Sequence, residues 1–507
     1  MNKSLQRVFH YHETTKHSQQ RYARSLGYMD WSTQPNPFRN YNGVESIELP
    51  LALENTTPPY HLLDSYLPSA PLLKESISQL LQFSMGLAAW KVSGDSSWAV
   101  RCNASSGNLH PTETYLILPP VLEEQNHKTS VLHYTPKNHG LEHLTAFDTS
   151  FWDTLPKQSF LIGLSSISWR EVWKYGERAF RYVNLDSGHA WQSFVVSAKM
   201  LGWKITRLDS VSDADISSLL GVNQENRFFE TEIGDMLFVV SPEFVDPSLN
   251  IEALLEQVPL KYEGVANKLS PSMQSWDIIP EIENATSAPQ IKQAQTQHSS
   301  IVREATQESK NVVLHRRSIH VMDKVTSSIT KEQFHAILSS VNEPLDAKEN
   351  SAHLVLFVHR VEDYESGLYI YIRNERDKEP LKEQMHTAFK WNKTELKDLY
   401  FLEGRDLQMA SKAISCSQDI ASDGAFSLGM LCNFSEQIQD YGAHRYKELY
   451  WECGAIGQQL YLEATSFRLS GTGIGCFLDD TVHNMLGLKD NRFQTLYHFT
   501  VGRGYVD

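Results

Sequence analysis

Residues 175–198, YGERAFRYVNLDSGHAWQSFVVSA, align without a gap on residues 441–464, YGAHRYKELYWECGAIGQQLYLEA, at a shift of 266 positions. The same shift places Gly188 on Gly454. A fixed offset over this length indicates a duplicated architecture. The chain is therefore predicted to hold two related domains in tandem.

Each copy of the repeated segment reads as a long helix with apolar residues around most of its circumference. Examples are Val195, Val196, Met200 and Leu201 in the first copy and Leu460, Tyr461 and Leu462 in the second. A helix that is apolar on most sides is buried on most sides. We therefore expect both copies to lie at a domain centre or at the interface between the domains.

A polar segment separates the two halves. Residues 263–312 are rich in Ser, Pro, Gln, Asn and Thr, a composition typical of a linker. The predicted domains are thus 1–262 and 313–507. The alternative is a long surface loop of one large domain, with Trp276 and Ile278-Ile279 anchoring part of it.

Coarse patterns favour an α+β fold in both halves. Apolar residues recur at helical spacing over 73–88, and Thr330 with Gln333 forms a capping-box pattern at the start of another helix. Short apolar runs predict buried strands. These runs are 114–118, 160–164, 353–359 and 368–372.

Composition excludes several classes of protein. A net charge of -15 over 507 residues disfavours a nucleic-acid partner. No window approaches the roughly 20 apolar residues of a membrane span, and the amino terminus has no signal-like apolar region, so we expect a cytoplasmic protein without a membrane partner.

The cysteines and histidines give no metal or disulfide signal. The five cysteines are odd in number, scattered and without a CxxC pair. His10, His12 and His17 are close together in sequence but have no partner carboxylate at ligand spacing. We therefore expect no metal site.

Residues 101–113, RCNASSGNLHPTE, lead directly into the strand TYLIL. Small residues and a glycine let backbone amides approach a ligand, while Ser105, Ser106 and Asn108 offer neutral hydrogen bonds. The pattern suits a planar polar heterocycle. The alternative is an ordinary turn-rich loop before a strand.

RCNASSGNLHPTETY resembles the flavin-binding loop of the nitroreductase superfamily, in particular its SagB-type or azoline-dehydrogenase branch. Ala104 stands where that family has proline. The resemblance implies two tandem nitroreductase-like domains, each with an antiparallel-type sheet flanked by helices. It also implies an FMN cofactor. The residues it assigns to FMN in this loop are Arg101, Ser105, Ser106, Asn108 and His110.

Residues 315–320, HRRSIH, resemble the Arg-Arg-Ser that opens nitroreductase domains and binds the FMN phosphate. Guanidinium groups match phosphate oxygens in a bidentate manner. By this resemblance Arg316, Arg317 and Ser318 hold the phosphate, together with Arg503 of the terminal TVGRGYVD.

The glycine-rich run SGTGIG at 470–475 has no glycines in the aligned first-half segment KITRLD. In nitroreductases the loop after the long helix lies along the isoalloxazine ring, which implies roles for Gly471, Gly473 and Ile474. The first half also has Lys16-His17-Ser18 in place of Arg-Arg-Ser and Ser241-Pro242 in place of Gly-Arg. The second half, over 342–353, lacks Ser-Ser-Gly-Asn.

Nitroreductases are homodimers with FMN at the subunit interface. A tandem fusion therefore implies an intramolecular pseudo-dimer with two composite sites. Because each half lacks motifs that the other half keeps, the flavin-binding residues are complete at one site only. The expectation is one FMN per chain.

Lys174-Tyr175 stands in front of the long helix, where the azoline-dehydrogenase branch has an adjacent Lys-Tyr with an acid/base role. A lysine with a lowered pKa or a tyrosine can take the proton that leaves carbon during dehydrogenation. The second half has Asp440-Tyr441. The alternative is a surface lysine beside a core tyrosine.

These patterns predict an FMN-dependent oxidoreductase that transfers a hydride to or from an organic substrate, with NAD(P)H as a candidate electron donor. Two chemistries remain open: reduction of a nitro or quinone acceptor, and SagB-like oxidation of an azoline in a peptide. A third alternative is a non-catalytic flavin-binding or scaffold pseudoenzyme. The substrate, a small molecule or a peptide heterocycle, and the choice between monomer and homodimer stay undetermined.

Overall fold

The structure, a computed structural model, describes residues 2–289, 303–342 and 349–505. Its two halves each contain a seven-stranded antiparallel sheet. In the first the strand order is β2 (Ser46–Glu48), β7 (Gly140–Phe147), β6 (Thr129–Thr135), β5 (Thr112–Leu118), β8 (Phe160–Ser166), β10 (Ile233–Ser241) and β9 (Lys204–Arg207). In the second it is β14 (Asn392–Lys393), β15 (Leu399–Gly404), β13 (Gly367–Tyr371), β12 (Ala352–Val358), β16 (Phe426–Asn433), β18 (Phe493–Gly502) and β17 (Ser470–Ile474).

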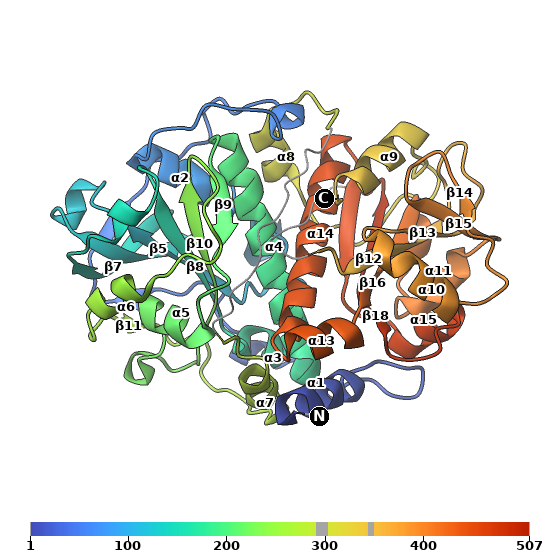
Figure 1. Cartoon of the computed structure of the whole chain (residues 1–507), viewed down its shortest axis with the longest axis horizontal. Helices are drawn as coiled ribbons and strands as arrows, with labels where there is room; N and C mark the ends of the chain where they lie inside the picture. The colour runs from blue at the N-terminus through green and yellow to red at the C-terminus, as the bar shows by residue number, and fades with distance from the viewer. Residues whose placement is uncertain (1, 290–302, 343–348, 506–507) are drawn as a thin grey trace.

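The helices cover these sheets and fill the space between them (Figure 1). The first half contains α1 (Lys3–Thr14), α2 (Lys74–Gln82), α3 (Trp169–Tyr175), α4 (Ala179–Met200), α5 (Asp213–Leu220), α6 (Glu252–Gln257) and α7 (Ile278–Ala285). The second contains α8 (Ser309–His315), α9 (Lys331–Ser339), α10 (Lys378–Gln384), α11 (Gln408–Ile414), α12 (Ile420–Asp423), α13 (Ser435–Tyr441), α14 (Arg445–Ser466) and α15 (Asp479–Leu486). Two small two-stranded antiparallel sheets complete the fold. One pairs β1 (Tyr41–Asn42) with β11 (Val265–Ala266), far apart in sequence, and the other is the hairpin of β3 (Leu87–Ser93) and β4 (Ser96–Arg101).

The repeat found in the sequence is a repeat of structure. Helices α3, α4 and α5 begin and end 266 positions before α13, α14 and α15. The predicted α+β fold with two tandem domains forming an intramolecular pseudo-dimer is confirmed. The expected strands over 114–118, 160–164, 353–359 and 368–372 correspond to β5, β8, β12 and β13.

The two repeated helices, α4 and α14, pack side by side between the sheets, as expected for helices that are apolar on most sides (Figure 1). Their closest approach is at two glycines. A Cβ atom on Gly188 would lie 2.1 Å from the carbonyl oxygen of Trp451, and one on Gly454 would lie 2.0 Å from that of Leu185. The missing side chains therefore let the two helix backbones touch.

One helix is shorter than its sequence pattern suggests. The apolar periodicity over 73–88 predicts a single helix, but α2 ends at Gln82, and Ala88 lies in β3. Gly86 packs so tightly on the last helical turn that an added Cβ would be 2.4 Å from the Gln82 carbonyl oxygen. The chain reverses there into the β3–β4 hairpin, which carries it to the loop that follows Arg101.

The predicted domain limits, with a linker over 263–312, stay a prediction, and residues 290–302 lie outside the described part of the chain. Within that linker the structure places β11, α7 and the start of α8. Ile279 and Ile282 of α7 are buried in a core that also contains residues of both halves. Arg303 forms ion pairs with Asp64 (2.6 Å) and Glu463 (3.1 Å).

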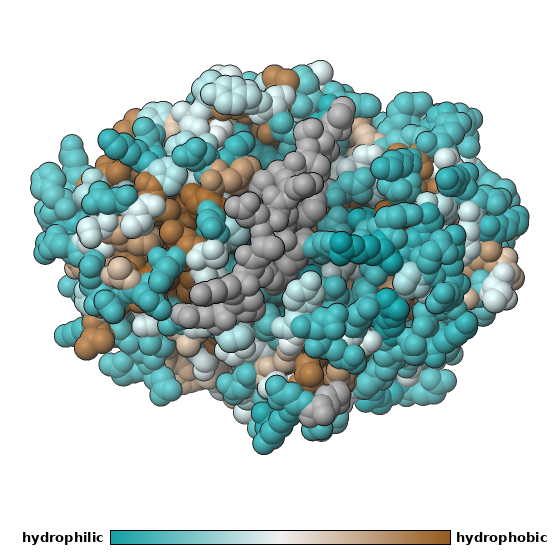
Figure 2. Space-filling view, viewed as in Figure 1, coloured by the Kyte–Doolittle hydropathy of each residue, from teal (hydrophilic) through white to brown (hydrophobic). Residues whose placement is uncertain are grey.

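Among the described residues, no helix is both long and apolar enough to cross a membrane. In the view of Figure 2, hydrophobic residues are visible mainly on the first domain, whereas the second domain presents a mostly hydrophilic face.

Candidate functional site

The flavin-type loop of the first half meets the Arg-Arg-Ser segment of the second half. Arg316 donates from Nε to the carbonyl oxygen of Cys102 and from Nη2 to that of Arg101, both at 2.8 Å. The amide of Ala104 donates to Oε1 of Gln458 on α14 at 3.1 Å. Two segments more than two hundred residues apart therefore form one wall at the interface between the domains.

Two guanidinium donors in this wall, Arg101 Nε and Arg316 Nη1, are buried and have no hydrogen-bond partner among the described residues. His110 Nδ1 is buried and unpartnered there as well, and it is an acceptor because the ring donates from Nε2 to Asn108 Oδ1 at 3.0 Å. Neither arginine forms an ion pair within the part of the chain that the structure describes. Burial lowers the pKa of Arg101 to about 10, and burial also lowers the pKa of Arg316. Buried cationic donors without an acceptor are costly, so this donor set fits an electron-rich or anionic ligand.

The hydroxyls of the loop serine residues bind the protein itself. Ser105 Oγ donates to Asp186 of α4 at 2.5 Å, and Ser106 donates to the same carboxylate from its amide and hydroxyl, both at 2.9 Å. Asn108 donates to the Ala99 carbonyl oxygen at 2.9 Å. These bonds hold the loop in place and occupy its serine hydroxyl groups within the protein.

The predicted acid/base pair lies against this loop. Gly107 has a φ of 60°, and a Cβ there would be 2.9 Å from the Tyr175 hydroxyl and 3.1 Å from Lys174 Nζ. Lys174 Nζ lies 5.4 Å from the centroid of the Tyr175 ring. Within the described chain it has no hydrogen-bond or ion-pair partner. The structure thus brings together two motifs that are separated by some sixty residues.

Two carboxyl groups that sequence reasoning missed lie at the same place. Glu171 lies one turn before Lys174 on α3, is fully buried, and both of its carboxyl oxygens lack a hydrogen-bond partner among the described residues. Burial raises its pKa well above the usual range, with a further contribution from Asp186. Burial likewise raises the pKa of Asp186 to about 7, against the lowering effect of the serine hydrogen bonds. The i, i+3 spacing of Glu171 and Lys174 was the available signal.

The repeat-equivalent positions in the second half are paired instead. At the 266 shift Glu171 corresponds to Gln437, whose Oε1 accepts from Arg445 Nε at 3.0 Å. Asp186 corresponds to Glu452, which accepts from Arg373 at 2.7 Å. Only the first copy therefore keeps titratable groups free of such partners, next to its loop and Lys174.

The predicted phosphate-binding residues are only partly assembled. Arg317 follows Arg316 and donates from Nη1 to the carbonyl oxygens of Leu314 and Arg316, both at 2.7 Å. Ser318 shares a 2.7 Å hydrogen bond with the Tyr461 hydroxyl. Arg503 is exposed just after β18. The side chains of Arg316, Arg317 and Ser318 therefore each bond to different protein groups, and Arg503 is exposed on the surface.

The glycine-rich segment lies in β17 and just beyond it. A Cβ on Gly471 would be 2.7 Å from the Phe499 ring, and one on Gly473 would be 1.8 Å from the Tyr497 hydroxyl. Ile474 is buried. These glycines leave room for aromatic side chains of the same domain, a use that the sequence pattern does not reveal.

Comparisons with known proteins agree with this architecture. Residues 282–503 match the family model described as "Nitroreductase family". A putative nitroreductase from Anabaena variabilis ATCC 29413 has a TM-score of 0.71 at 20% identity, over 98% of this chain and 99% of its own. No curated protein sequence matches this chain significantly.

Two further structures match only one half. A putative nitroreductase from Ralstonia eutropha JMP134 covers 42% of this chain and 95% of its own at 13% identity, with a TM-score of 0.30. The E. coli microcin synthetase McbBCD complex with truncated pro-MccB17 covers 48% of this chain and 94% of the matched chain at 18% identity, with a TM-score of 0.29. At these scores neither match adds to what is known of the fold. Residues 282–503 thus match the nitroreductase family, and the structure repeats the same sheet order in the first half of the chain.

Proposed function

We propose that this protein is an FMN-dependent oxidoreductase with a single composite site between its two domains. The observation that carries the proposal is the asymmetry between the repeat copies. Within the described chain, Lys174, Glu171 and Asp186 form no ion pair beside the first-half loop, whereas Gln437 and Glu452 are paired with arginines. Buried titratable groups without partners mark functional sites more often than structural ones.

The residues at this interface fit an FMN group. The donors of Arg101 and Arg316 that lack partners among the described residues would supply hydrogen bonds to acceptor atoms of FMN, and His110 Nδ1 would accept one from a ring N–H. Hydrogen bonds of Ser105, Ser106 and Asn108 fix the loop beside them. Arg316, Arg317, Ser318 and Arg503 would hold the phosphate, and Gly471, Gly473 and Ile474 would lie along the ring. When bound, FMN would accept or donate a hydride.

The proton would be handled by residues of α3. The Lys174 amine, free of an ion pair and adjacent to the Tyr175 hydroxyl, is able to take or give a proton at a substrate atom above the loop. Burial raises the pKa of Tyr175 well above its usual range, so its hydroxyl stays protonated and acts as a donor. Burial favours the protonated form of Glu171, which then adds no negative charge beside Lys174.

The Lys-Tyr pair favours SagB-like dehydrogenation of an azoline in a peptide over reduction of a nitro or quinone acceptor. A site for proton removal from carbon is needed in the first reaction and not in the second. NADH or NADPH would be needed as electron donor only for the reductive alternative.

The test is spectroscopic. The purified full-length chain should be yellow and release about one FMN per polypeptide, since only one site keeps its residues. A ratio near two would contradict the single-site proposal, and a colourless protein that also refuses added FMN would favour a scaffold pseudoenzyme. Anaerobic mixing with NADPH, NADH or an azoline-containing peptide then separates the two chemistries, because the flavin bleaches only with its own reductant.

A further inference from the structure

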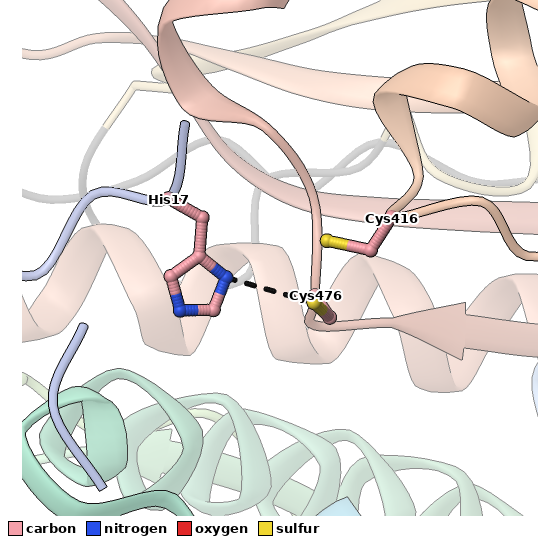
Figure 3. Close-up of side chains that lie close together, drawn as sticks. All are labelled: His17, Cys416 and Cys476. Atoms are coloured by element: carbon pink, nitrogen blue, oxygen red, sulfur yellow. Dashed lines mark hydrogen bonds between the residues drawn. The ribbon is translucent and has the colours of Figure 1, made fainter. Parts of the chain in front are cut away.

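Three potential metal ligands come together from distant segments. His17 follows α1 in the first half, Cys416 follows α11, and Cys476 follows β17 (Figure 3). One ligand atom of each residue lies within 4.8 Å of the others, and Cys476 Sγ is 3.5 Å from His17 Nδ1. No sequence pattern indicates this group, because about four hundred residues separate His17 from Cys416 and sixty separate Cys416 from Cys476.

The spacing of the ligand atoms suits a tetrahedral zinc ion. With Zn–S of about 2.3 Å and Zn–N of about 2.0–2.1 Å, two tetrahedral ligands of this kind lie about 3.5 Å apart. The observed Sγ–Nδ1 distance has this value. Two thiolates and a neutral imidazole would also balance the charge of a divalent ion, and the thiolate–imidazole set is one that zinc prefers.

The surrounding chain holds these ligands in place. The amide of His17 donates to Asp479 Oδ2 at 2.9 Å, and the amide of Asp479 donates back to the His17 carbonyl oxygen at 3.0 Å. The His17 ring packs on Tyr22 with centroids 4.6 Å apart. These contacts fix the position of a ligand that comes from outside the second domain.

Cys416 has an unusual backbone. Its φ is 54° and that of Ser417 is 61°, two consecutive non-glycine residues in the left-handed region. Such a conformation costs energy and is retained where surrounding structure or a ligand requires it. It turns the Cys416 side chain toward Cys476 (Figure 3).

We propose that His17, Cys416 and Cys476 bind one divalent ion that prefers thiolate and imidazole ligands, such as Zn²⁺. The ion ties the segment after α1 to the end of the glycine-rich strand of the second domain, and its fourth position is left to water or a small ligand. This differs from the sequence-based expectation of no metal. A Cys416–Cys476 disulfide is the competing state of the same thiols.

The first experiment measures zinc by mass spectrometry in the reduced full-length protein, purified without a metal-affinity tag and dialysed after incubation with Zn²⁺. We expect about one zinc per chain, lost in His17→Asn, Cys416→Ser and Cys476→Ser. Cys432→Ser is the matched control. The sulfur atoms of Cys432 and Cys453 also lie 3.5 Å apart, but among the described residues this buried pair belongs to no group of three potential ligands. Zinc retained by His17→Asn, or absent from the wild type, would overturn the proposal.

A second measurement does not depend on the variants folding. In the zinc-loaded wild type, Cys416 and Cys476 should resist alkylation and become reactive after chelation, and Co²⁺ in place of zinc should give the visible spectrum of a tetrahedral thiolate site. Equal alkylation with and without chelator contradicts the site. A Cys416–Cys476 disulfide in peptide mapping of protein incubated with Zn²⁺ under nitrogen assigns these thiols to redox chemistry instead.

Discussion

Gly188 of α4 and Gly454 of α14 face each other's helix backbone, and neither position has room for a Cβ atom. They are equivalent residues of the two repeats, so the contact lies on the pseudo-symmetric axis of the molecule. The site proposed above extends on both sides of this contact, with Asp186 on α4 and Gln458 on α14. The distance between the two helices therefore sets the geometry of the interface between the domains.

Gly188→Ala should destabilise the protein although alanine is the better helix former. Intrinsic propensity alone would stabilise the helix by about 1 kcal/mol, but the added Cβ would overlap the Trp451 backbone and cost roughly 1–3 kcal/mol or more. Chemical unfolding would show the lower free energy of unfolding. Gly429→Ala is the comparison, because its Cβ would meet only side-chain atoms of His498 and Thr495, at 3.2 Å, and no backbone atom, so a smaller loss is expected. Equal midpoints for the two variants would contradict the close helix contact.

Lys174→Ala should leave flavin bound and slow turnover by roughly 10²–10⁴-fold, the usual contribution of a positioned acid or base. Its side chain contacts Tyr175 and Gly107 and supports no ion pair within the described chain. The measurement is steady-state turnover together with the flavin absorbance of the variant. Asp440→Ala, the repeat equivalent, should leave both unchanged. Unaltered turnover in Lys174→Ala would remove this residue from the mechanism.

Asp186 should make stability depend on pH. Burial raises its pKa to about 7 in the folded chain, whereas an unfolded aspartate titrates near about 3.9. The folded state therefore binds a proton that the unfolded state has released, so the contribution of this group is full below about pH 4 and is lost as pH rises to about 7.

Asp186→Asn removes that titration. The free energy of unfolding of the variant relative to wild type should rise between pH 4 and 7, by at most roughly 4 kcal/mol. The asparagine amide also disturbs the bond from Ser106, but that offset does not vary with pH. Urea unfolding of both proteins at a series of pH values measures this difference in the free energy of unfolding. Parallel curves for the two proteins would mean that Asp186 is ionised throughout.

Arg316→Lys should weaken flavin retention even though the positive charge remains. The three N–H donors of a lysine sit on one nitrogen, so they cannot span the positions of Nε and Nη2, which bond the loop carbonyl oxygens, and of Nη1, which would meet the ligand. Loss of one hydrogen bond to a charged group corresponds to about 1.5–3 kcal/mol, or roughly 10-fold or more in the dissociation constant of FMN. Equilibrium titration of the apoprotein with FMN measures this dissociation constant. Arg405→Ala, an exposed arginine of the same domain, should bind as wild type does.

The sequence by itself determined the duplication and the type of fold. The 266-residue shift predicts the bounds of α3, α4 and α5 relative to α13, α14 and α15. The buried pair α4 and α14 carries this signal, because a helix buried on most sides keeps its length and apolar pattern. Apolar runs located β5, β8, β12 and β13 for the same reason. The motifs that suggested a flavin site were also local, since each is a short contiguous segment.

Only the tertiary structure decided which groups are paired. Glu171 and Asp186 form no ion pair among the residues that the structure describes because of what surrounds them in space, and Glu452 gains Arg373 in the same way. The shortening of α2 and the aromatic contacts of Gly471 and Gly473 depend equally on neighbours distant in sequence. His17, Cys416 and Cys476 meet only when both domains are folded, because metal-ligand geometry is a property of distances between atoms and not of spacing along the chain.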